Sequence, residues 1–209
     1  MKTYSLIKQI LLGSILVLNL KLSFGADWPM WGRDGTRNMV SDEKNITLDF
    51  NPGEMNDDEV VDMKTTNNVK WVAKLGSQAY GNVTIGNGYV FVGTNNESPR
   101  DSGKIGDRGV VMCLDEKTGE LKWQLVIPKL GAGKVSDWEY IGICSSAAIE
   151  GDKVYVVTNR CEVVCLDING LADGNDGPFK DEAAYVRPKG LKDELNPKLD
   201  ADILWMYDM

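Results

Sequence analysis

Leu114-Asp115-Glu116-Lys117-Thr118-Gly119-Glu120-Leu121-Lys122-Trp123 is the stretch of sequence that decides the fold. An apolar run, residues 110–114, leads into it and is typical of a β-strand. Asp-x-x-Thr-Gly is a polar turn that ends in a glycine, and Leu-x-Trp begins the next apolar run. The stretch therefore predicts two antiparallel strands joined by a short turn, with a tryptophan at a set place on the second strand.

The same pattern occurs elsewhere in the chain. Residues 83–94 read as a strand, a Gly-Asn-Gly turn and a second strand, and residues 147–158 repeat this hairpin around Gly151-Asp152. The alignment places Ile85 on Ile149. A third strand follows each hairpin, and residues 110–115 match residues 162–167, with Cys113 on Cys165. The repeat predicts the same local structure twice.

Tryptophans mark the ends of the repeating units. Trp71, Trp123 and Trp205 end the short segments 68–71, 120–123 and 202–205, and the second interval is longer because residues 168–204 form an insertion rich in Gly, Asp, Lys and Pro. A four-stranded unit that recurs every ~40–50 residues is typical of a propeller blade, because stacked blades bury faces that one sheet leaves exposed. We therefore expect residues 26–209 to be all-β, a partial β-propeller of about three blades, with the three tryptophans docking between neighbouring blades.

The stretch 114–123 resembles the tryptophan-docking repeat of the pyrroloquinoline-quinone (PQQ) propellers, the quinoprotein alcohol dehydrogenase-like superfamily. The segment 27–38, Asp-Trp-Pro-Met-Trp-Gly-Arg-Asp-Gly-Thr-Arg-Asn, is similar to the opening of such chains. The resemblance implies a quinoprotein-type propeller, and such propellers include both enzymes and scaffolds. Two features depart from the redox members: the chain has no adjacent cysteine pair, and no motif matches the residues that hold the quinone and its calcium ion.

The blade count bears on completeness. A closed ring needs ~4–8 blades, and the repeats here amount to fewer. We expect an N-terminal fragment of a longer propeller; the alternative is a short protein that assembles its ring from several copies. The partners expected are therefore the remaining propeller blades or another protein.

Charge and composition exclude several classes of function. Lys plus Arg number 23 and Asp plus Glu 31, for a net charge of −8, which argues against a nucleic-acid partner. The chain has no histidine, so this stretch lacks the means for a Ser-His-Asp triad or an HExxH zinc site.

The N-terminus predicts export. Lys2 and Lys8 precede an apolar run over residues 10–20, and small residues around Gly25 suit cleavage there, so residues 1–25 are interpreted as a signal peptide. The alternative is an N-terminal membrane anchor. No later apolar stretch is long enough to cross a bilayer. We expect a periplasmic or extracellular protein without a transmembrane segment after the signal is removed.

An exported chain can oxidise its cysteines. In the predicted hairpin, Cys144 and Cys161 lie near the upper limit of bridging distance, so a structural disulfide between them is one hypothesis and free thiols are the alternative. Cys113 and Cys165 fit small buried apolar residues in strands.

The insertion opens with an oxygen-rich run, residues 167–177, that carries three Asp and two Asn. Carboxylate and carbonyl oxygens suit calcium, but no starting position satisfies the EF-hand spacing. The sequence therefore favours a solvated loop here, and we predict no metal site.

Three functions remain open at this level. The first is an exported PQQ-like propeller whose complete form binds a ligand or partner. The second is a PQQ-dependent alcohol or sugar dehydrogenase, with PQQ and calcium bound only in a complete propeller. The third is a non-catalytic scaffold for protein interaction, similar to the propeller of the outer-membrane assembly machinery. No residue of this stretch is assigned a catalytic or cofactor-binding role.

Overall fold

The computed structural model describes residues 26–131, 137–187 and 195–209. The predicted signal peptide, residues 1–25, lies outside the described residues. Strands dominate the described part, and every strand pair in the named sheets is antiparallel. The all-β prediction is confirmed.

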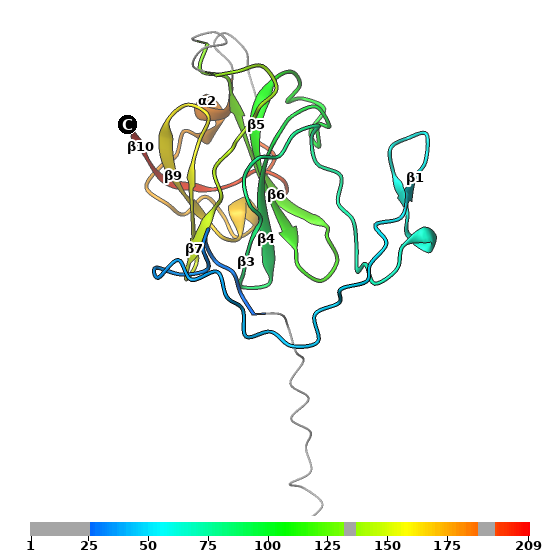
Figure 1. Cartoon of the computed structure of the whole chain (residues 1–209). Helices are drawn as coiled ribbons and strands as arrows, with labels where there is room; N and C mark the ends of the chain where they lie inside the picture. Colours follow the sequence, from blue (N-terminus) through cyan, green and yellow to red (C-terminus); the bar gives the residue numbers. More distant parts are fainter. Residues whose placement is uncertain (1–25, 132–136, 188–194) are drawn as a thin grey trace, which may run out of the picture.

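Two four-stranded sheets make up most of the fold (Figure 1). The first contains β3 (Thr84–Gly86), β4 (Tyr89–Asn95), β5 (Arg108–Asp115) and β6 (Leu121–Pro128), in that order. The second contains β7 (Ala148–Glu150), β8 (Lys153–Val157), β9 (Glu162–Asp167) and β10 (Ile203–Asp208), also in sequence order. Each sheet is an up-and-down antiparallel unit of the kind that forms a propeller blade, and we call them the first and second blade.

The turns explain why these strands pair as they do. Asn87 and Gly88 both have positive φ, which a two-residue hairpin turn of the favoured hand requires. The turn places Ile85 opposite Val90, and the second hairpin places Ile149 opposite Val154. The repeated hairpins therefore have equivalent registers.

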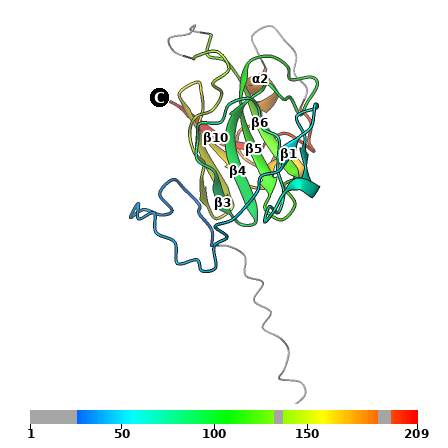
Figure 2. The ribbon, with the colours of Figure 1, turned by 45° about the vertical axis from the view of Figure 1, so that its right-hand side comes forward.

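One face of each blade is buried against the other blade. Apolar residues of both blades form a single core cluster, and Figure 2 shows the two sheets side by side. The members from the first blade include Phe91, Val111, Trp123, Leu125 and Ile127; those from the second include Ile149, Val154, Val156, Val164, Leu166 and Ile203. Burial of two apolar sheet faces is what holds the blades together.

The N-terminal segment ties the inner edges of the two blades. Trp28 exchanges two backbone hydrogen bonds with Ile85 of β3, at 2.8 and 3.0 Å. The carbonyl of Pro29 then accepts a hydrogen bond from the amide of Ile149 in β7, at 2.7 Å. The stretch that resembles a quinoprotein opening thus bridges both innermost strands.

The unit that ends at Trp71 contains only a two-stranded sheet. β1 (Glu54–Met55) pairs with β2 (Val61–Asp62), and a 3-10 turn, η1 (Met63–Thr65), follows. Trp71 itself lies in extended chain outside any strand, and Trp71, Ala73 and Leu75 pack on the outer face of the first blade. Apolar residues earlier in this unit, such as Ile46, Leu48 and Phe50, are exposed, and the unit forms no four-stranded sheet.

The insertion after β9 is more buried than the sequence analysis predicts. It contains η2 (Gly170–Ala172) and α2 (Glu182–Val186), and Tyr185 and Val186 join the central core. Its end runs alongside β6, where Gln124 and Asp200 form a parallel bridge. The sequence predicts a solvated loop for residues 167–177, and there the structure is mixed: Asp173 and Asp176 are exposed, whereas Ile168 and Leu171 are buried. Tertiary contacts bury residues of the insertion that have no local apolar pattern.

A buried ion pair fixes this end of the insertion. The Lys104 ammonium contacts Asp101 and Asp200, both at 2.8 Å, and the side chains of Lys104 and Asp200 are 2% and 4% exposed. Replacing one member of a buried pair leaves the other charge without compensation. We expect Lys104→Ala to lower the free energy of unfolding by about 3–5 kcal/mol in urea denaturation. Lys153→Ala, which removes an exposed pair with Asp152, is the control and should leave the urea midpoint unchanged. Equal effects of the two substitutions would contradict the anchoring role.

Candidate functional site

Trp123 docks on the turn that follows β9 of the second blade. Its indole N–H donates a hydrogen bond to the carbonyl of Ile168 at 2.8 Å, and its side chain is almost fully buried. The ring lies against Gly170, which has a φ of +62°, and a Cβ there would approach the ring to 2.7 Å. Glycine is therefore required at this position for two reasons: the backbone has a positive φ, and the indole ring leaves no room for a Cβ.

Trp71 makes the same contact one unit earlier. Its indole N–H donates to the carbonyl of Glu116 at 2.9 Å, and its ring lies against Gly119, which has a φ of +75°. In both cases the acceptor residue directly follows the last Asp of a strand, and donor and acceptor are 45 residues apart. The indole–turn contact is thus a repeated feature, and it joins each tryptophan to the next unit along the chain.

Trp205 occupies the equivalent place on the second blade but has no such turn to contact among the described residues. Trp123 lies in a row of cross-strand neighbours with Cys113 and Phe91, and Trp205 lies in the matching row with Cys165 and Tyr155. The two ring pairs have similar geometry. In Phe91–Trp123 the ring centroids are 5.8 Å apart and the ring planes are inclined by 52°, and in Tyr155–Trp205 these values are 6.1 Å and 50°. The row in the first blade is buried, whereas Trp205 is 42% exposed.

The exposed side of the second blade is therefore apolar. We call it the free face, and it consists of Tyr155, Val157, Val163, Trp205 and Tyr207. Val157 and Tyr207 are exposed, and Tyr155 and Val163 are half-buried. The corresponding face of the first blade is the one that the second blade covers. Exposed apolar patches of this kind mark interaction surfaces.

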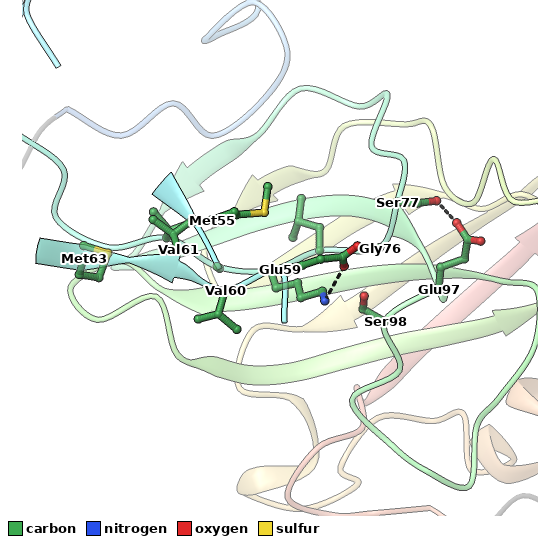
Figure 3. A pocket seen from close by; sticks show the side chains of 13 residues that line it. Met55, Glu59, Val60, Val61, Met63, Gly76, Ser77, Glu97 and Ser98 are labelled. Atoms are coloured by element: carbon green, nitrogen blue, oxygen red, sulfur yellow. Dashed lines mark hydrogen bonds and ion pairs between the residues drawn. The ribbon is translucent and has the colours of Figure 1, made fainter. Parts of the chain in front are cut away.

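A cleft on the other side of the molecule is the second candidate (Figure 3). It measures about 740 Å³ and lies between the β1–β2 hairpin and the segment that follows Trp71. Its apolar walls include Met55, Val60, Met63 and Val72, and all four side chains are exposed. Its rim holds the Lys74–Glu59 ion pair, at 2.9 Å, and a hydrogen bond from Ser77 to Glu97. The chemistry fits an apolar ligand or side chain.

The four cysteines are free thiols in the structure. Cys113 and Cys165 are buried, and burial raises the pKa of both thiols, which makes them unreactive. Cys144 and Cys161 are exposed, and the predicted disulfide between them is not formed here. Their pairing under oxidising conditions stays a prediction.

A buried polar group, which no sequence pattern predicts, lies between the insertion and β9. The Tyr185 hydroxyl donates to Glu162 at 2.6 Å, and the Arg160 guanidinium lies 5.6 Å from the Tyr185 ring centre. Burial, together with the hydrogen bond to the Glu162 carboxylate, raises the pKa of Tyr185. Tyr185 lies in the insertion and Glu162 lies on β9, and no fixed spacing relates the two residues. A sequence motif therefore could not predict their contact.

Two features are absent from the residues that the structure describes. No three His, Cys, Asp or Glu side chains of this part stand together in an arrangement that holds a metal ion. In the same ranges, no helix has the length and apolar character needed to cross a membrane.

No protein-family model matches the chain, and no curated protein matches it. Among solved structures, the crystal structure of BamB from Moraxella catarrhalis is similar at 20% sequence identity and a TM-score of 0.33, over 63% of this chain and 24% of that chain. The chain thus spans about a quarter of the length of that protein.

The docking geometry predicts different costs for two equivalent tryptophans. Trp123→Ala should lower the free energy of unfolding by about 3–5 kcal/mol, because it removes a fully buried aromatic side chain. Trp205→Ala should cost about 1 kcal/mol, the worth of one aromatic pair. Urea denaturation of both variants measures the difference, and a cost below about 1 kcal/mol for Trp123→Ala would contradict the docking.

Thiol accessibility separates the two cysteine pairs. In the reduced native chain, we expect Cys144 and Cys161 to react rapidly with a disulfide reagent such as dithionitrobenzoate, and Cys113 and Cys165 to react only after unfolding. After air oxidation, loss of the rapid reaction would show that Cys144 and Cys161 pair. Rapid reaction of Cys113 in the native state would contradict its burial.

Proposed function

We propose that this chain is part of an exported β-propeller that works as a non-catalytic scaffold for protein interaction, and that its free face receives a further blade-type sheet. The observation that carries the proposal is the exposure of Trp205, at 42%, and of half-buried Tyr155, in the row that they form with Cys165. The matching row of the first blade, Phe91–Cys113–Trp123, is buried by the second blade.

The contact between the first and second blades indicates which groups a partner of the free face should present. Trp123 is covered by a sheet whose facing side chains include Val154, Val164 and Leu166, and whose next turn supplies a carbonyl and a glycine. A partner for the free face should therefore present a row of branched apolar side chains. It should also present a tight turn with a carbonyl that accepts the Trp205 indole N–H.

A second copy of this chain fits the free face less well. Its two docking turns, at Glu116–Gly119 and Ile168–Gly170, are already filled by its own Trp71 and Trp123. The outer face of its first blade is also packed against residues 71–75. We therefore favour a blade from a longer form of the chain or from another propeller-type protein over a second copy.

Export rests on the signal-like N-terminal sequence, and an acidic surface fits a protein that does not bind nucleic acid. The dehydrogenase hypothesis rests on the family resemblance alone. No observation on the described residues favours it over the scaffold.

Site-specific photo-cross-linking tests the proposal. A photoreactive phenylalanine analogue replaces Tyr207, an exposed residue of the free face on the edge strand β10, in the protein as its own cells make it. We expect a high yield of cross-links to one apolar strand segment close to an Asp-x-x-x-Gly or Asp-x-x-Gly turn, identified by mass spectrometry. The same analogue at Lys117, an exposed turn residue, is the control.

The cross-linked peptide also identifies the source of the sheet. A peptide of the same longer chain indicates a further blade, and a peptide of another protein indicates a partner in trans; both support a blade-type occupant. Equal yields at Tyr207 and Lys117, or no cross-link at Tyr207, would overturn the proposal. Cross-links between two copies of residues 26–209 would overturn the choice of occupant.

A further inference from the structure

The start of β10 contains a carboxylate whose equivalent in the first blade is exposed. The backbone carbonyl of Glu120 accepts a hydrogen bond from Asp115, at 2.8 Å, and that of Asp202 accepts the same bond from Asp167, at 3.0 Å. Glu120 and Asp202 thus hold equivalent places. Glu120 lies in solvent, whereas the insertion covers Asp202 completely, at 0% exposure.

A second buried carboxylate converges on the same place. Asp202 Oδ2 accepts a hydrogen bond from the backbone amide of Asp176, at 3.3 Å. Glu182 Oε2, on α2, accepts one from the side-chain amide of the adjacent Asn175, at 2.7 Å. Glu182 is 1% exposed. Because Asn175 and Asp176 are consecutive, the two carboxylates lie around one dipeptide.

Each of these carboxylates has one oxygen without a hydrogen-bond partner. The two atoms are Asp202 Oδ1 and Glu182 Oε1, and both are buried. Lys180, the lysine of this loop, donates to Asn175 Oδ1 at 2.9 Å instead of contacting either carboxylate. A buried charge without a partner is strongly unfavourable, so the arrangement calls for a cation or a proton.

Other carboxylates add negative charge around Asp202. Burial, together with the nearby carboxylates of Glu182, Asp176 and Asp167, raises the pKa of Asp202 to about 6, against the lowering effect of the Asp176 amide. At neutral pH the group is therefore held close to other anions in a site closed to solvent. A bound cation would neutralise this repulsion.

We propose that Asp202 and Glu182, together with water and backbone carbonyl oxygens of the surrounding loop, form a binding site for Ca²⁺ between the insertion and β10. Calcium takes six to eight oxygen ligands in flexible geometry and accepts carbonyl and water oxygens beside carboxylates. Since no three acidic side chains of the described residues form a metal arrangement, backbone carbonyls and water supply the rest of the shell. Mg²⁺, which demands a near-ideal octahedron, suits such a site less well.

The site would couple calcium to the docking of the insertion. Gly177, the next residue but one after Asn175, packs so tightly on β10 that a Cβ would approach Leu204 to 2.8 Å. A cation at Asp202 and Glu182 would hold α2, this loop and the start of β10 together. The ion is thus expected to be structural, and the proposal does not depend on the scaffold function.

Calorimetric titration of the chelator-treated chain with CaCl₂ tests the site. We expect saturable binding of one Ca²⁺ per chain and a midpoint of thermal unfolding that rises with calcium concentration. Asp202→Asn and Glu182→Gln, which keep the size of each side chain, should weaken calcium binding at least tenfold. Glu120→Gln, at the equivalent exposed place in the first blade, is the matched control and should leave binding unchanged.

Three results would overturn the proposal. The first is the absence of calcium binding by the wild-type chain, in which case a proton on Asp202 satisfies the site. The second is equally tight binding by the Asp202→Asn variant. The third is the same weakening by Glu120→Gln, which would indicate a diffuse effect of surface charge. If the Asp202→Asn variant does not fold, Glu182→Gln provides the same test from the other ligand.

Discussion

One contact organises this structure: an indole N–H donates to the backbone carbonyl of the residue that follows a strand's last Asp, and the ring lies on a nearby glycine. Trp71 and Trp123 both make it, 45 residues from their acceptors. The contact ties each unit to the next one, because donor and acceptor belong to different units. Apolar burial between the blades supplies most of the stabilisation, and the indole contact sets how neighbouring units fit together.

The same constraint explains the properties of the second blade. Its Trp205 is built like Trp123, with a cysteine and an aromatic ring in the same row, yet no unit of the described part covers it. A sheet shaped for burial on both sides is covered on only one. The free face is therefore a consequence of the repeat, and the scaffold proposal follows from its incomplete burial.

Much of the fold could be predicted from local sequence, and the remainder could not. The hairpins follow from turn residues such as Gly88 and from apolar alternation, and the pairing of Ile85 with Val90 follows from the turn. The burial of the insertion could not be predicted, because it depends on contacts such as Lys104–Asp200, which join residues 96 positions apart. The burial of Asp202 escaped prediction for the same reason. The exposure of Trp205 could not be predicted either, because it depends on which units of the described part cover the second blade.

Hydrogen exchange of the tryptophan indole N–H groups, measured by NMR on ¹⁵N-labelled chain, tests the central claim most directly. The account predicts strong protection for Trp123, whose N–H is bonded and buried, and clear but weaker protection for the half-buried Trp71. Trp205 should exchange at close to the rate of a free indole. Protection of Trp205 equal to that of Trp123, or rapid exchange of Trp123, would contradict the account.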